Sequence, residues 1–113
     1  MANAQALIRN LSLICADGIW IDYWLGESIP LMQDMEESGW RELGSIWQSQ
    51  PEQWQIRFAT VIQFGDPRKA FAILTEMLLL PAPDVALRAA ESLKSIGRFD
   101  IPNKNQVNEH FNA

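Results

Sequence analysis

Few side chains of this 113-residue sequence are of types that catalyse reactions or bind metals. His110, the one histidine, lies in a polar C-terminal stretch, where a general base would lack a fixed position. Cys15, the one cysteine, follows Leu11 by one predicted helical turn, and we expect it to be a core residue rather than a nucleophile. No glycine-rich phosphate loop, nucleophile motif or metal-ligand spacing occurs. We therefore predict that the protein is not an enzyme and has neither a cofactor nor a metal site.

The first 37 residues combine acidic and aromatic side chains. The candidate site is Asp17, Trp20, Asp22, Tyr23, Trp24, Glu27, Asp34, Glu36 and Glu37. The aromatic rings either cover the end of the fold or act as partly exposed anchors on an acidic surface, which would bind a basic protein. A third interpretation is acid–base catalysis by paired carboxylates, but no accompanying motif supports it.

Charge is distributed unevenly along the chain, whose net charge is −5. Residues 1–56 carry two basic and eight acidic side chains, a net charge of −6, whereas residues 57–113 carry seven basic and six acidic side chains, a net charge of +1. This acidic balance argues against a nucleic-acid partner, which would require a basic face. The N-terminus lacks a signal-peptide pattern, no apolar run could span a membrane, and the single cysteine fits a reducing compartment. We expect a cytoplasmic protein.

The segment 81–97 has the clearest helical signals in the chain. Pro83 and Asp84 suit a first helical turn, and Gly97 suits a left-handed stop. Its apolar face has two alanines at the centre, Ala89 and Ala90, where a neighbouring helix can approach closely. The pattern is therefore typical of a helix that stacks against others.

Comparison of the chain with itself, shifted so that Trp40 aligns with Phe71, predicts an internal repeat. The other matched pairs are Leu43 with Leu74, Ile46 with Met77, Trp47 with Leu78, Trp54 with Val85, Ile56 with Leu87, Arg57 with Arg88 and Ala59 with Ala90. We call positions that this alignment matches repeat-equivalent. We expect the tryptophans in these pairs to be core residues, the two arginines to have structural roles, and Arg68 and Lys69 to be solvated. Two helical hairpins, 38–66 and 67–97, follow from the repeat.

Helix start and stop signals define the remaining elements. We predict a first helix over 2–16, a second from Asp17 to a stop at Gly26, and a third from Ser28 to about Glu37, opened by Pro30. Residues 49–52 match a capping box, and residues 66–67 match a cap followed by proline. Residues 1–37 would be an N-terminal cap or a diverged repeat, and residues 98–113 a tail, within one domain of residues 1–113.

The residues Pro83-Asp84-Val85, Arg88, Ala89-Ala90, Leu93 and Ile96-Gly97 resemble the second helix of a HEAT repeat, in particular the short HEAT-like repeats of bacterial proteins. This resemblance implies an all-α solenoid of antiparallel helical hairpins, with about six to seven helices. Small acidic proteins of this kind are similar to immunity proteins, which implies a basic cognate toxin, often a nuclease, and a monomer that forms a heterodimer with it. The alternative is a HEAT-like scaffold or accessory protein for an enzyme or a bilin-carrying protein, as in phycobilisome lyases.

Overall fold

The computed structural model describes residues 2–99, and in this part of the chain all regular secondary structure is helical, without a strand. In chain order the elements are α1 (Ala2–Leu11), α2 (Asp17–Ile19), a π-helical turn (Trp20–Trp24), α3 (Leu25–Gln33), α4 (Glu37–Ile46), a 3-10 turn (Trp47–Ser49), α5 (Glu52–Val61), a second 3-10 turn (Ile62–Phe64), α6 (Pro67–Leu78) and α7 (Pro83–Phe99). Six of these helices have nine residues or more. The all-α prediction is confirmed.

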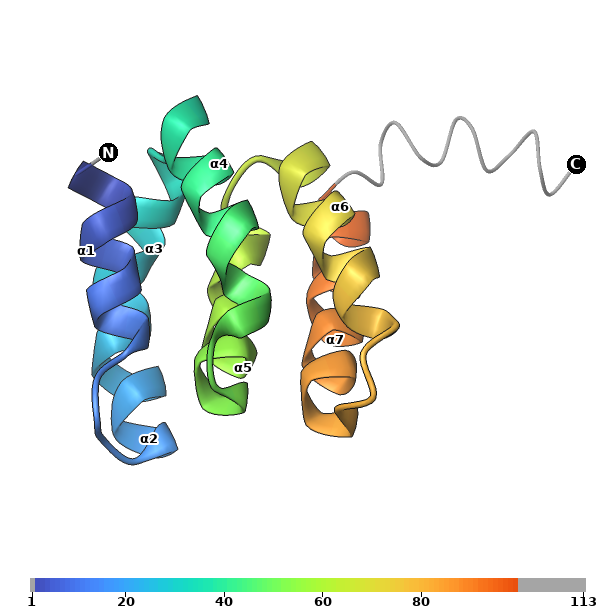
Figure 1. Cartoon of the computed structure of the whole chain (residues 1–113), viewed down its shortest axis with the longest axis horizontal. Coiled ribbons are helices and arrows are strands. Elements are labelled where there is room, and N and C mark those ends of the chain that lie inside the picture. The colour runs from blue at the N-terminus through green and yellow to red at the C-terminus, as the bar shows by residue number, and fades with distance from the viewer. Residues whose placement is uncertain (1, 100–113) are drawn as a thin grey trace, which may run out of the picture.

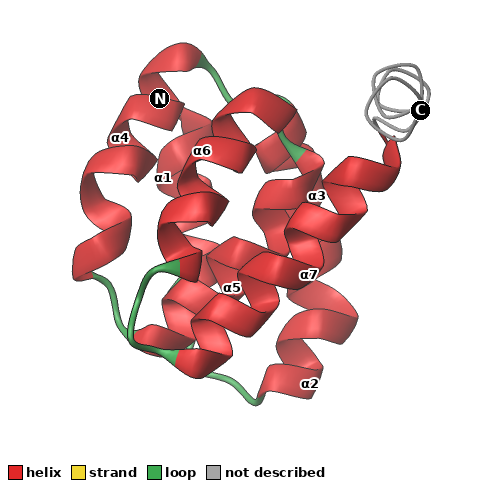
Figure 2. Ribbon diagram, turned by 90° about the vertical axis from the view of Figure 1, so that its right-hand side faces the viewer, coloured by secondary structure: helices red, strands yellow, loops and turns green. Residues whose placement is uncertain are grey.

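The helices follow one another along the long axis of the molecule. Figure 1 places α1 beside α3, then α4 with α5, then α6 with α7. Seen along that axis in Figure 2, α1, α4 and α6 lie towards one side, and α3 and α7 towards the other. Helix α7 packs on both α5 and α6, and α1 packs on both α3 and α4.

Helix α5 is at the centre of the core. Seven of its ten residues are buried, because it contacts α1 and α3 on one side and α7 on the other. Trp40, Trp47 and Trp54 are all buried in the same hydrophobic cluster. Their predicted core positions are confirmed.

Two predicted boundaries in the N-terminal part are wrong. Helix α1 ends at Leu11 rather than at residue 16. Gly26 and Pro30 do not separate two helices, because the chain stays helical from Asp17 to Gln33. A glycine and a proline both weaken a helix interior, but burial of Met32 in the same segment contributes in the opposite direction.

The helix ends around α5, α6 and α7 also differ in part from the prediction. Asp66 caps α6 as predicted, and its carboxylate accepts a hydrogen bond of 2.9 Å from the Arg68 backbone N–H. The predicted capping box at Ser49 is wrong, because the Ser49 hydroxyl donates to the Ile46 carbonyl and α5 begins after Pro51. Gly97 is not a left-handed stop either, since α7 continues to Phe99.

Some repeat-equivalent residues are buried in both pairs of helices, α4 with α5 and α6 with α7, whereas others are buried only in the first pair. Leu43 and Leu74 are both buried, as are Trp54 and Val85. However, Trp47 is 1% exposed whereas Leu78 is 40% exposed. The difference arises because α4 and α5 have neighbours on both sides along the long axis, whereas the described helices end at α6 and α7 (Figure 1).

Candidate partner-binding surface

The uninterrupted helical segment from Asp17 to Gln33 divides the predicted acidic and aromatic residues into two groups. At a rise of about 1.5 Å per residue, the segment is roughly 25 Å long. Asp17 therefore lies at the α2 end of the molecule, and the chain reaches Asp34 at the opposite end, where α4 starts (Figure 1). The predicted site residues do not form one continuous surface.

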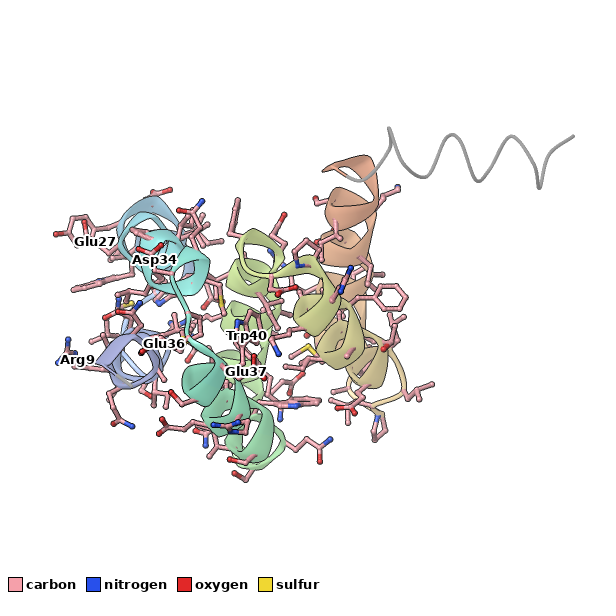
Figure 3. The ribbon with its side chains drawn as sticks, turned by 90° about the horizontal axis from the view of Figure 1, so that it is seen from above. Arg9, Glu27, Asp34, Glu36, Glu37 and Trp40 are labelled. Atoms are coloured by element: carbon pink, nitrogen blue, oxygen red, sulfur yellow. The ribbon has the colours of Figure 1, made fainter. Side chains whose placement is uncertain are left out.

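Three carboxylates gather where α3 leads into α4, and we call Asp34, Glu36 and Glu37 the upper acidic group. All three are exposed. Figure 3 labels them along the connection between the two helices, with Trp40 beside Glu37. Glu27 is two helical turns before Asp34 and therefore lies on the same side of α3, further from α4. The structure thus brings together three of the six predicted acidic residues.

A groove of about 600 Å³ adjoins the upper acidic group. It is lined by Gln33, Met35, Glu37, Trp40, Phe64, Gly65, Asp66, Pro67 and Lys69. Gly65 is needed there, because a Cβ atom at this position would lie 2.7 Å from the Trp40 ring. The groove is thus formed where the end of α3, the start of α4 and the start of α6 meet.

Lys69 is the basic side chain among the residues that line this groove. Its position in the sequence predicted a solvated side chain. Its Nζ lies 2.9 Å from Glu37 Oε2, and the side chain is half-buried. This ion pair joins α6 to α4 and neutralises one carboxylate at the groove. Asp66 adds another carboxylate to the groove. The sequence predicted Asp66 only as the cap of α6 and not as a residue of the candidate site.

Trp20 is not a surface anchor, and that prediction is wrong. Its side chain is only 1% exposed, and its Nε1–H donates a 2.9 Å hydrogen bond to the Asn10 carbonyl in α1. The Arg57 guanidinium lies over the Trp20 ring, 5.4 Å from its centroid. The ring therefore joins the helical segment of α2 and α3 to α1 and α5, which is the structural interpretation that the sequence left open.

Asp22, Tyr23 and Trp24 lie on the π-helical turn after α2, at the end of the molecule opposite α4. Asp22 and Tyr23 are exposed, and Trp24 is half-buried. The Tyr23 and Trp24 rings meet edge to face, with their centroids 4.9 Å apart. One aromatic residue of the predicted set, Tyr23, is therefore available on the surface.

Asp17 is engaged within the protein. Its Oδ1 lies 3.7 Å from Arg57 Nη2 and accepts a 2.8 Å hydrogen bond from Gln53 Nε2. Asp17 would therefore have to give up these contacts in order to bind a partner as predicted.

Arg57 organises the loop between α1 and α2. Its Nη1 donates to the carbonyls of Leu11 and Leu13 at 3.2 and 2.7 Å, and its Nη2 donates to the Cys15 carbonyl at 3.1 Å. Cys15 consequently lies in this loop and is half-buried, not on the helix that the sequence predicted. Arg57 has the structural role expected of it, and burial of its side chain agrees with that role.

A second groove of about 600 Å³ lies beside this loop, and its walls include Ile14, Pro51 and Trp54. The Trp54 indole Nε1 is buried there without a hydrogen-bond partner. The groove lies on the side of the α2 end, away from the upper acidic group. The Nη donors of Arg57 are already used by the loop carbonyls, whereas its Nε, like Trp54 Nε1, is buried without a hydrogen-bond partner. It is thus a weaker candidate for a site than the groove beside α4.

Among residues 2–99 no helix is both long and apolar enough to cross a membrane. The same part of the chain contains no group of three or more His, Cys, Asp or Glu side chains placed to hold a metal ion. His110 lies outside the described residues, as does the predicted tail from residue 100 onward.

Comparison of the sequence and structure with family models, curated proteins and solved structures finds no match.

Proposed function

We propose that this protein is a non-catalytic binding module whose upper acidic group holds a basic protein, in the way that an immunity protein neutralises a bacterial toxin of the nuclease type. The observation that carries the proposal is the groove between α3, α4 and α6, which has exposed carboxylates along its edge. A basic side chain of the partner would enter the groove, and the partner's own substrate cleft would be blocked. The proposed location is cytoplasmic, and the proposed complex is a heterodimer.

The electrostatics of the groove suit such a partner. Glu37 is already paired with Lys69, so an arginine of the partner would take over this carboxylate by forming a bidentate pair that lysine cannot form. Asp34 and Glu36 are exposed at the rim, where carboxylates mainly increase the rate of association. Trp40 and Phe64 provide apolar walls for the aliphatic part of the entering side chain.

A HEAT-like stack of antiparallel hairpins is part of the proposal. It is supported by the order of the helices along the long axis and by shared burial at repeat-equivalent positions, such as Phe58 with Ala89. Stacked helical repeats present extended surfaces for protein partners, and function resides in the residues placed on those surfaces. The groove beside α4 would be one such surface.

A growth test examines the function directly. The C-terminal domain encoded by the neighbouring upstream reading frame is induced in cells with and without this protein, and rescue of growth is measured. We expect the intact chain to rescue growth. We expect the triple variant Asp34→Asn, Glu36→Gln, Glu37→Gln to fail, because it removes the charges of the upper acidic group while leaving the core unchanged.

A second triple variant with the same change in charge provides the control. Glu52→Gln, Glu76→Gln, Asp84→Asn neutralises three exposed carboxylates that lie outside both the groove and the candidate site, so rescue should persist. Circular dichroism must show that both variants are folded. Equal rescue by both triple variants would show that the upper acidic group is not the binding surface, and equal loss would show that only net charge matters.

The alternative function is a HEAT-like scaffold or accessory module for an enzyme or a bilin-carrying protein. The specific observation in its favour is a group of exposed apolar side chains on α6 and α7, which includes Phe71 and Leu87. A scaffold of this kind should tolerate neutralisation of the upper acidic group. Loss of function in the first triple variant alone therefore distinguishes the binding module from the scaffold.

A further inference from the structure

One surface of α6 and α7 is made of positions whose equivalents in the preceding pair, α4 and α5, are buried. We call this surface the end face and define it by Phe71, Leu78, Ala86, Ala90 and Leu93. The repeat-equivalent residues of the preceding pair are Trp40, Trp47, Gln55, Ala59 and Ile62, and all of them are buried. On the end face, by contrast, Phe71 is 54% exposed, Leu78 is 40% exposed and Ala90 is exposed. Ala86 and Leu93 are half-buried.

Helical geometry places these residues on one side of each helix. Phe71 and Leu78 are two helical turns apart on α6, and Ala86, Ala90 and Leu93 follow the i, i+4, i+7 spacing on α7. Lys69, by contrast, points back to Glu37 on α4. The end face therefore points away from α4 and α5, where a further pair of helices would pack.

The two helices at the opposite end of the molecule expose mainly polar side chains. The exposed residues of α1 are Gln5 and Arg9, and α3 exposes Glu27 and Gln33 beside Gly26 and Pro30. Ile14, Ile19 and Tyr23 are exposed on the loop and the turn between these helices. Because α1 and α3 present polar side chains, packing the end face on them would bury less apolar surface than packing two end faces together.

Charge also distinguishes the end face from the rest of the molecule. Residues 67–97 carry four basic and three acidic side chains, a net charge of +1, whereas residues 1–56 carry −6. Two copies of this acidic protein therefore repel each other least when they approach through α6 and α7. A basic partner of the kind proposed for the upper acidic group has no electrostatic reason to bind here.

We propose that the end face is the interface of a homodimer in which two copies pack α6 and α7 against the same helices of the other copy. A twofold axis brings identical apolar faces together, which closes the assembly. Ala86 and Ala90 allow close approach of the two α7 helices, and Phe71 and Leu78 supply the larger apolar contacts. The dimer leaves the groove beside α4 open in each copy, so each copy pairs with one partner as proposed above and the homodimer joins two such pairs. This inference does not depend on the proposed function.

Sedimentation equilibrium of the full chain tests the dimer. We expect a monomer–dimer equilibrium in the range of about 1 to 100 μM, typical of an interface of modest size. Ala90→Glu should weaken dimerisation by at least about 100-fold, because the twofold axis places two like charges within an apolar contact. Ala90 is exposed in the monomer and glutamate is a good helix former, so this variant should fold normally.

Leu79→Glu is the matched control, since Leu79 is 85% exposed and lies outside the end face. Its dimerisation constant should stay within about twofold of the original, because surface substitutions away from an interface have small effects. A full chain that remains monomeric at about 100 μM, or equal weakening by both variants, would overturn the proposal. If a chain truncated after Phe99 dimerised while the full chain did not, residues 100–113 rather than a second copy would cover the face, and the proposal would again be wrong.

Discussion

The pair α4 and α5 and the pair α6 and α7 have similar apolar patterns, but several side chains that are buried in the first pair are exposed in the second. Trp47 is buried whereas Leu78, its repeat-equivalent residue, is 40% exposed. Arg57 is buried among loop carbonyls, whereas Arg88 is about one-third exposed and pairs with Glu91 on its own helix. The difference shows that the pattern of a helix specifies which side is apolar, and that the neighbouring helices decide whether that side is buried.

The largest expected effect of this difference is on the apolar pair. Trp47→Ala should lower the free energy of unfolding by about 3 to 5 kcal/mol, because it removes a fully buried ring from the core. Leu78→Ala should lower it by less than about 1 kcal/mol, since the side chain is already partly in water. Urea denaturation followed by circular dichroism measures both.

These unfolding measurements should be made at protein concentrations where the chain is monomeric, because the proposed dimer would bury Leu78. Similar costs for the two variants in the monomer would contradict the difference in burial between the two pairs of helices. A cost for Leu78→Ala that rises with protein concentration would instead support the dimer.

The arginine pair should show the next largest effect. Arg57→Met should destabilise the protein by about 3 kcal/mol, because the carbonyls of Leu11, Leu13 and Cys15 lose their donors. Arg88→Met should cost about 1 kcal/mol or less, as expected for an ion pair at the surface. Denaturant unfolding gives the two values.

Hydrogen exchange adds a measurement that separates the loop from the whole protein. In Arg57→Met, amides of residues 12–16 should exchange faster even under conditions where the core remains protected. The role assigned to Arg57 would be wrong if these amides exchanged at the original rate while global stability fell.

Local patterns predicted the helices of the second half well. The apolar spacing of residues 38–97 identified Leu43, Trp54 and Leu74 as buried, and Asp66 was correctly predicted as a cap. These features depend on contacts within one helix or on a side that always faces the adjacent helix. Short-range sequence signals are sufficient for them.

The candidate site was harder to predict because it depends on how segments are placed in space. The sequence predicted a helix break at Gly26, between Asp17 and Asp34. The continuous helical segment instead separates them by roughly 25 Å. Similarly, the spacing of Trp20 and Trp24 identified a shared side of the helix but could not show that Trp20 is fully buried whereas Trp24 is only half-buried.

The smallest predicted effect concerns the contact that joins the two pairs of helices. The Ser92 hydroxyl on α7 is buried and donates a 2.6 Å hydrogen bond to the Ala59 carbonyl on α5. Ser92→Ala should therefore cost about 1 kcal/mol, the net contribution of one buried hydrogen bond.

Thr75→Ala provides the comparison, because the Thr75 hydroxyl donates only to the Phe71 and Ala72 carbonyls of its own helix. Such local bonds compete with the helical pattern and alanine is the better helix former, so the cost should lie within about 0.5 kcal/mol of zero. Thermal unfolding of both variants, analysed at a common temperature, gives the two values. If Thr75→Ala were the more damaging substitution, the bond between α5 and α7 could not be what fixes the end pair of helices on the central one, and apolar packing alone would have to do so.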